Sequence, residues 1–360
     1  MRVIGCNAAY GAGGIGQHLA HLVEEFRDAG TLHQYLAPRV RPHDAHGHVV
    51  ASSRLTSWVQ ACPPIRWMPG WRNHLGNDLY DRALADALPP TGHTYMGFVG
   101  KSLRTFQAAH RAGYTTLELV AANSHVDTVT RQHAKAAGDL GIRDSWLNDA
   151  QRRKTKAEYA LADRIYVHST YVHDSFVEAG IPESCLVRTN LHPANRFVPP
   201  AHRSHQGPFH IVYVGRLDAT KGIPLLVNAF ARLSDVPLRL TLVGGWSTPT
   251  MRRYMQRACA RDPRITVAPG DPLPVLQQAD VFVHPSYEDG FGYAPAEALA
   301  CGVPVVATRD TGMAEHITQG VNGYVIPTGS VDALVDRIHY LIEHPLATTT
   351  SLWPHSTAVR

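Results

Sequence analysis

The stretch "FHIVYVGRLDATKGIPLLVNAFARL", residues 209–233, decides the fold. It opens with a continuous apolar, β-branched run at 209–215 that ends on a glycine, and it continues at 222–233 with apolar residues at helical spacing. Continuous apolar runs are typical of strands buried on both faces, as in parallel sheets that helices cover on each side. The stretch therefore predicts a buried strand, a loop and a helix that packs on the sheet.

The same pattern recurs through the second half of the chain. Helical segments such as 251–260 lie between four further β-branched runs, at 238–245, 264–270, 279–286 and 302–308. Strands that alternate with helices indicate a doubly wound α/β domain. Ligands of such domains bind beyond the carboxyl ends of the strands.

The first half begins in the same way. Residues 2–7 read as a strand and 15–30 as an amphipathic helix, and the Pro- and His-rich segment 191–208 is typical of a linker. We therefore predict two Rossmann-like, doubly wound parallel-sheet domains. Their expected limits are 1–195 for the N-terminal domain, 207–345 for the C-terminal domain and 346–360 for a short C-terminal tail.

Composition and charge narrow the class of protein. The chain has 360 residues, of which 44% are hydrophobic and 18% charged, as is ordinary for a globular protein. A net charge of +4 is too small to indicate nucleic-acid binding, but it suits a polyanionic ligand or an anionic membrane surface. The five cysteines lack C-x-x-C spacing, and no apolar run is long enough for a signal peptide or a membrane span. These features predict a cytoplasmic protein.

A glycine-rich loop follows the first predicted strand. "YGAGGIGQHL" at 10–19 places Gly11, Gly13 and Gly16 at the spacing of a dinucleotide site. A nicotinamide site would also need a glycine directly after the strand and a carboxylate at the end of the next strand, and both are missing. The loop instead predicts a phosphate site at a helix N-terminus, where bare N–H groups attract anions. A tight turn without a ligand is the other interpretation.

Two cations follow the strand at 209–215. Arg216 comes directly after the glycine that ends this strand, and Lys221 lies at the start of the next helix. Both are expected to project into the crevice at the strand ends, where they would neutralise a diphosphate leaving group as its bond breaks. Two solvated surface charges are the alternative.

The segment "HPSYEDGFGYAPAEALACGVPVVAT", 284–308, is the most informative one. It predicts a loop with Glu288 and Asp289, followed by a short Ala-rich helix with Glu297. A carboxylate accepts up to four hydrogen bonds, so Asp289 and Glu297 each suit a vicinal diol, one on a sugar and one on a ribose. Alternatively, Glu297 stabilises the helix dipole.

These motifs, in this order and spacing, resemble the retaining glycosyltransferases of family 4. The resemblance runs from Met1 to about His344, and it implies the GT-B fold, in which two Rossmann-like domains face each other across a nucleotide-sugar cleft. It implies an acceptor-side N-terminal domain and a donor-side C-terminal domain. This family usually continues into long helices that cross back onto the first domain, so the short tail implies looser domain closure or a truncated chain.

The resemblance also implies roles for individual residues. Gly14, Arg216 and Lys221 would bind the donor diphosphate, and Glu297 would hold the ribose. The remaining implied contacts are the backbone of Gly290, Phe291 and Gly292 at the donor sugar, Tyr293 and Ala294 near the phosphates, and His125 beside the transferred sugar. The first acid of the family motif falls on Asp289 with Glu288 beside it, so either carboxylate could contact the sugar. His125 could equally be a hydrogen-bonded structural histidine.

The implied function is a retaining transfer of a hexose from a UDP-, GDP- or ADP-sugar to a hydroxyl of a glycan, a glycolipid or a small molecule. No metal or other cofactor is expected. The alternative is a non-catalytic nucleotide-sugar-binding protein of the same fold.

Two further clusters leave alternatives open. His43, His46 and His48 could chelate a metal or lie in a solvated loop. The basic run of Arg152, Arg153, Lys154 and Lys156 could touch anionic lipid at the inner membrane face, if the acceptor is lipid-linked, or form a solvated helix face.

Overall fold

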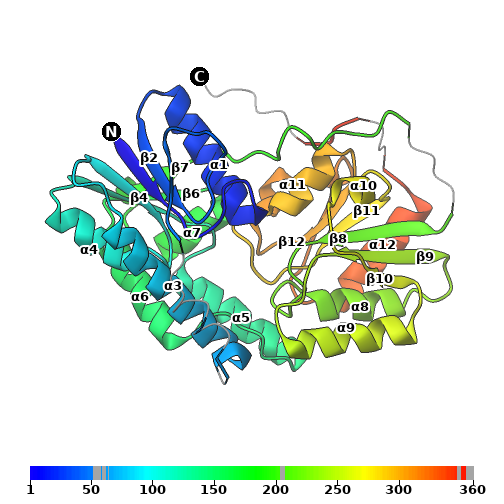
Figure 1. Ribbon diagram of the computed structural model, residues 1–360. Helices are drawn as coiled ribbons and strands as arrows, with labels where there is room; N and C mark the ends of the chain where they lie inside the picture. The colour runs from blue at the N-terminus through cyan, green and yellow to red at the C-terminus, as the bar shows by residue number, and fades with distance from the viewer. Residues whose placement is uncertain (52–57, 59–61, 64, 203–206, 347–349, 354–360) are drawn as a thin grey trace. The chain divides into compact units, whose positions relative to one another are not determined.

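The computed structural model describes residues 1–51, 58, 62–63, 65–202, 207–346 and 350–353. The chain divides into two compact units (Figure 1). The first unit comprises Met1–Thr130 and Ser145–Leu191, and the second comprises Arg131–Asp144 and His192–Arg360. Each unit is built on one parallel sheet.

The first unit contains, among its described residues, a seven-stranded sheet of order β3-β2-β1-β4-β5-β6-β7 in which all neighbours are parallel. The strands are β1 (Arg2–Gly5), β2 (Leu32–Ala37), β3 (Gly47–Val49), β4 (Thr94–Phe98), β5 (Thr116–Val120), β6 (Arg164–Val167) and β7 (Leu186–Arg188). The helices are α1 (Gly13–Asp28), η1 (Ile65–Trp67), α3 (Pro69–Asp86), α4 (Leu103–Arg111), α6 (Asp149–Leu161), α7 (Thr170–Glu178) and η2 (Glu183–Cys185). Helix α5 (Val126–Leu140) begins in this unit and belongs to the second unit from Arg131 onward. Helix α1 buries Leu19, Leu22, Val23 and Phe26, the apolar face that its sequence spacing predicts.

The second unit contains, within the part that the structure describes, a six-stranded parallel sheet of order β10-β9-β8-β11-β12-β13. The strands are β8 (Phe209–Val214), β9 (Leu238–Val243), β10 (Ile265–Val267), β11 (Val281–His284), β12 (Val305–Thr308) and β13 (Gly323–Ile326). The helices are α8 (Ile223–Ala231), α9 (Pro249–Arg261), α10 (Leu273–Leu276), α11 (Tyr293–Ala300), η3 (Gly312–His316) and α12 (Val331–Glu343). Helices α8 and α9 lie on one face of this sheet and α11 on the other (Figure 1).

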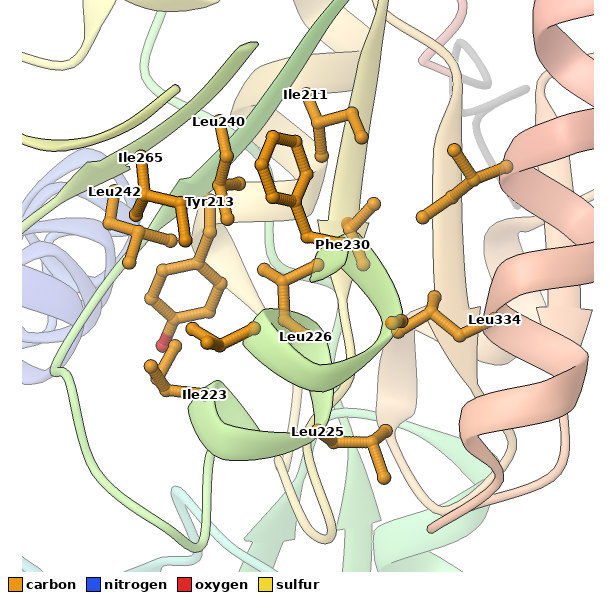
Figure 2. Close-up of a cluster of buried hydrophobic side chains, with 14 of the residues drawn as sticks. Ile211, Tyr213, Ile223, Leu225, Leu226, Phe230, Leu240, Leu242, Ile265 and Leu334 are labelled. Atoms are coloured by element: carbon orange, nitrogen blue, oxygen red, sulfur yellow. The ribbon is translucent and has the colours of Figure 1, made fainter. Parts of the chain in front are cut away.

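The core of the second unit lies between the sheet and α8. Figure 2 shows Tyr213 and Leu240 from the strands against Leu226 and Phe230 of α8, with Leu334 of α12 at the side. All five side chains are buried. Burial of whole aliphatic and aromatic side chains contributes roughly 1.5–3 kcal/mol each, so this core fixes where β8 and its following loop emerge.

The predicted fold class is confirmed, because both sheets are parallel and helices cover them. Strands β3, β4, β5, β7 and β13 were not predicted. His48 lies in β3 rather than in the expected polar loop. The expected domain limits stay a prediction. The structure adds that Arg131–Asp144 groups with the second unit.

Of the predicted tail, residues 347–349 and 354–360 lie outside the described residues. Residues 350–353 pack on the second unit, where the Leu352 N–H donates a hydrogen bond to the Leu299 carbonyl at 2.8 Å. Across the described part of the chain, we find no helix with the length and apolar character needed to cross a membrane.

Candidate functional site

The second sheet reverses its strand order between β8 and β11, so the loops that leave these two strands start at the same edge. Ligands of open parallel sheets bind at such reversal points. Gly222 shows how closely the two loops approach, because its φ is +71° and a Cβ there would lie 2.0 Å from the Pro285 carbonyl oxygen. Only glycine fits this position without a shift of backbone.

Asp218 organises the loop after β8. Its side chain is only 1% exposed, and it accepts hydrogen bonds from Arg216 Nε, from the Thr220 hydroxyl at 2.7 Å and from the Lys221 N–H at 2.8 Å. A carboxylate with three such donors fixes both the turn and the direction of the guanidinium. The Arg216 side chain remains 46% exposed, so the guanidinium stays accessible to a ligand.

Lys221 joins the two loops. Its Nζ donates to the Glu288 carbonyl oxygen at 3.0 Å and to Asp289 Oδ2 at 2.9 Å. His284, the last residue of β11, lies with Nε2 3.2 Å from the same Oδ2. Each cation of the site therefore has a carboxylate partner, Asp218 for Arg216 and Asp289 for Lys221.

These pairings hold the two carboxylates in their charged form. Burial by itself would raise the pKa of Asp218 and of Asp289, but the neighbouring cations and hydrogen-bond donors outweigh it, so both pKa values are lowered. For Asp218 the largest opposing cause is Arg216, and for Asp289 it is Lys221. The carboxylates therefore hold both cations in fixed orientations at this edge of the sheet.

The loop after β11 is largely buried. Glu288 is 3% exposed and Phe291 is 4% exposed, and Gly292, with φ +86°, immediately precedes α11. The Phe291 ring packs against Tyr293 at 5.1 Å, His316 at 5.8 Å and Trp353 at 6.0 Å between ring centroids. The described part of the tail thus supports the loop that carries Gly290, Phe291 and Gly292.

Helix α11 carries the other predicted donor contacts, Tyr293, Ala294 and Glu297. Glu297 is 4% exposed and lies beyond the first turn, where α11 has no acidic residue, so the helix-dipole interpretation is not supported. Burial raises the pKa of the Tyr293 hydroxyl, and the negative charge of Glu297 raises it further. The Tyr293 hydroxyl is buried without a hydrogen-bond partner among the described residues.

The structure thus brings Arg216, Lys221, Asp289 and Glu288 together at one edge of the second sheet. Gly14 and His125 belong to the first unit. Gly14 is exposed in the first turn of α1, and the residue that precedes this helix, Ala12, makes no side-chain cap.

His125 has the contacts of a packed histidine. It is 5% exposed and lies between the rings of Tyr159 at 4.9 Å and Phe176 at 5.3 Å. Its Nδ1 accepts a hydrogen bond from the Asp127 N–H, in the first turn of α5, at 3.3 Å. Burial lowers its pKa against the opposing charge of Asp127, so the imidazole is neutral at pH 7.

Sequence reasoning missed three residues of the second unit's site. Asp218 reads as an ordinary loop acid, although its place two residues after Arg216 in a turn was a usable signal. His284 ends an apolar run and reads as a strand residue. His133 comes from α5, far away in sequence, yet Arg216, Asp218 and Lys221 all act on its pKa, which burial lowers to about 4.

The expected solvated or lipid-facing basic run is wrong at Lys154. This residue is 5% exposed, and its Nζ lies 2.7 Å from Asp81 and 3.2 Å from Asp78, both on α3. Arg152 and Lys156 both pair with Asp127. Lys154 therefore holds α6 against α3, whereas Arg153 is exposed.

The histidine cluster near residue 45 has ordinary backbone partners. His46 Nδ1 lies 3.0 Å from the His33 carbonyl oxygen, and His48 is part of β3. In the described ranges, no group of three or more histidine, cysteine or acidic side chains is placed to hold a metal ion.

Solved structures share this architecture along almost the whole chain. Sucrose-phosphate synthase from Thermosynechococcus elongatus has a TM-score of 0.73 at 18% identity, covering 97% of this chain and 92% of that one. Anabaena Alr3699/HepE, solved in complex with UDP and glucose, has a TM-score of 0.68 at 16% identity, covering 98% and 92%. The fold is therefore GT-B, the predicted fold of two Rossmann-like units.

The family match lies in the second unit. Residues 195–351 match the family described as glycosyl transferases group 1. D-inositol 3-phosphate glycosyltransferase of Pseudarthrobacter chlorophenolicus is 34% identical over 163 residues, which cover 41% of this chain and 39% of that protein. Glycogen synthase of Mycobacterium tuberculosis is 28% identical over 224 residues, covering 59% and 54%. The matches thus span only about half or less of these relatives' lengths.

Proposed function

We propose that the protein is a glycosyltransferase that moves a hexose from a nucleoside-diphosphate sugar to a hydroxyl acceptor with retention of anomeric configuration. The single observation that carries this proposal is the pair of oriented cations, Arg216 and Lys221, at the strand-order reversal of the second sheet. The match of residues 195–351 to glycosyl transferases group 1 supports the same reaction class.

In this proposal the second unit binds the donor. Arg216 and Lys221 bind the diphosphate. Glu297 accepts hydrogen bonds from the ribose hydroxyls, and Asp289 accepts them from the hydroxyls of the donor sugar. The backbone of Gly290, Phe291 and Gly292 lies along the sugar, and Tyr293 and Ala294 lie near the phosphates. The first unit supplies Gly14 to the diphosphate, His125 to the sugar and the acceptor pocket.

The chemistry follows from the charges. As the glycosidic bond breaks, negative charge develops on the leaving diphosphate, and two preorganised cations stabilise it. The acceptor hydroxyl attacks from the leaving-group side and passes its proton to a donor phosphate oxygen. The orientation of the cations by Asp218 and Asp289 reduces reorganisation during this step.

The test is to incubate the purified protein with UDP-, GDP- or ADP-hexoses and an acceptor. Release of the nucleoside diphosphate measures transfer, and NMR of the product's anomeric proton shows whether the configuration is retained. Lys221→Ala should abolish transfer with an unchanged circular dichroism spectrum. Arg232→Ala is the matched control, because Arg232 forms an exposed ion pair with Asp332 in the same unit. Binding without hydrolysis or transfer for every donor would instead favour a nucleotide-sugar-binding protein.

A further inference from the structure

We propose that His284 is a positioning residue that orients the carboxylate of Asp289 toward the donor sugar. This proposal rests on the proposed function and adds a residue that no sequence motif marks. It concerns the end of β11, where His284 and Asp289 meet Lys221.

His284 is a buried polar side chain that packing alone does not explain. It is 3% exposed, and its ring lies 6.5 Å from that of Phe282, two residues earlier in β11. In the described ranges neither ring nitrogen makes a well-directed hydrogen bond. Because buried polar groups are nearly always satisfied, such a group calls for a functional explanation.

The explanation lies in the Asp289 carboxylate. Lys221 Nζ donates a hydrogen bond to Oδ2 at 2.9 Å, and His284 Nε2 lies 3.2 Å from the same oxygen, within ion-pair distance but without hydrogen-bond geometry. No hydrogen bond or ion pair involves Oδ1 within the described part of the chain. The protein therefore fixes Oδ2, and Oδ1 is available to accept a hydrogen bond from a sugar hydroxyl.

The second contact matters when the donor binds. A diphosphate adds an anionic partner to Lys221, which would weaken its hold on Asp289. His284 belongs to a buried strand and cannot follow the lysine, so it keeps the carboxylate in place. The side chain of aspartate is one methylene shorter than that of glutamate, which keeps this carboxylate within reach of the strand end.

Glu288 is less suited to the sugar contact. Glu288 is only 3% exposed, whereas the side chain of Asp289 is 21% exposed. The choice between the two neighbouring acids therefore falls on Asp289, with His284 as the residue that orients it.

The kinetic test uses His284→Phe, which keeps a ring against Phe282 and removes both nitrogens. We expect kcat/KM for the nucleotide sugar to fall at least tenfold, while inorganic pyrophosphate binds within twofold of wild type by calorimetry. His284→Gln, whose amide can still donate to Oδ2, should recover part of the loss. His210→Phe is the control, because His210 is an equally buried histidine on β8 with Gln278 and Thr241 as partners.

A second readout does not depend on activity. In ¹⁵N-histidine NMR spectra, Asp289→Asn should shift the ring nitrogens of His284 and leave those of His210 unchanged. An unmoved His284 signal, or equal losses of kcat/KM in His284→Phe and His210→Phe, would overturn the inference. Absence of turnover by the wild type with a shifted His284 signal would count against the proposed function alone.

Discussion

At the residue scale, the site is built from opposite charges that hold each other in place. Arg216 and Lys221 each pair with an aspartate of low exposure, and each aspartate is kept anionic by its partner. Removal of one partner of such a pair leaves the other charge without compensation. Under the proposed function, the two aspartates should therefore contribute to donor binding by holding the cations in place.

Asp218→Asn tests this view. The amide keeps the shape of the carboxylate but loses the charge-assisted bond to Arg216, and hydrogen bonds to charged groups contribute about 1.5–3 kcal/mol. We expect the donor KM to rise about ten- to hundredfold. Steady-state kinetics of this variant should be compared with those of Asp332→Asn, which removes the exposed partner of Arg232. Equal KM values in both variants would contradict the role of Asp218.

A second prediction concerns acid stability. Burial lowers the pKa of His168 to about 3, and its ring lies 4.1 Å from that of His18, whose pKa is lowered by burial and by His168. In the unfolded chain, a histidine has its ordinary pKa of about 6.5. This histidine's contribution to stability is thus complete above about pH 6.5 and is lost as the pH falls toward the folded pKa.

His168→Gln should remove this dependence. When the pH is lowered from 6.5 to 5, the free energy of unfolding should fall by about 2 kcal/mol less in the variant than in the wild type. Urea unfolding at both pH values measures it, and His110→Gln, at an exposed position of α4, should behave as wild type. An unchanged pH dependence in His168→Gln would show that His168 takes up its proton equally well in the folded and the unfolded chain.

At the element scale, the site depends on the close approach of the loops after β8 and β11. Gly222→Ala would place a Cβ 2.0 Å from the Pro285 carbonyl oxygen at a positive φ, so the loops must move apart. We expect destabilisation by more than about 3 kcal/mol and loss of donor binding. Gly245→Ala, which meets no atom within 4 Å, is the control for thermal unfolding and pyrophosphate binding.

The elements that the sequence revealed were those with long apolar runs. The strands at 209–214 and 238–243 stood out, whereas β3 and β13 are only three and four residues long and carry little periodicity. The cations were placed at the strand ends because the strands themselves were readable.

The unpredicted parts of the site depend on long-range packing. From the sequence alone, Lys154 is expected to be a surface charge. Its partner Asp81 lies on α3, 73 residues earlier in the chain, and only the fold brings the two together. His284 likewise becomes informative only once its burial is known. A single polar residue without a motif carries no sequence signal of this kind.

At the scale of the whole molecule, the second unit is not continuous in sequence. Within Arg131–Asp144, Leu140 and Ile142 pack against the core of that unit, and Asp144 accepts a hydrogen bond from the Ser247 hydroxyl. Lys135 lies over the Tyr287 ring at 5.5 Å. A piece of the N-terminal half is therefore part of the core of the second unit.

Leu140→Ala should consequently destabilise the second unit, by about 2 kcal/mol for a partly buried leucine. Hydrogen exchange followed by mass spectrometry should show faster exchange in β8, β9 and α8, with β1 and β4 unchanged. Phe106→Ala, in the core of the first unit, should give the opposite pattern. Faster exchange of β1 and β4 in Leu140→Ala would show that this leucine serves the first unit.

The segment 131–144 also has a consequence for biosynthesis. This segment leaves the ribosome before any strand of the sheet on which it packs. Its apolar side chains therefore stay exposed while some 200 further residues are translated. During that interval the nascent chain is exposed to chaperones and to mispairing with other chains. Slow translation between residues 145 and 341 would lengthen this vulnerable period, and the yield of native protein should fall accordingly.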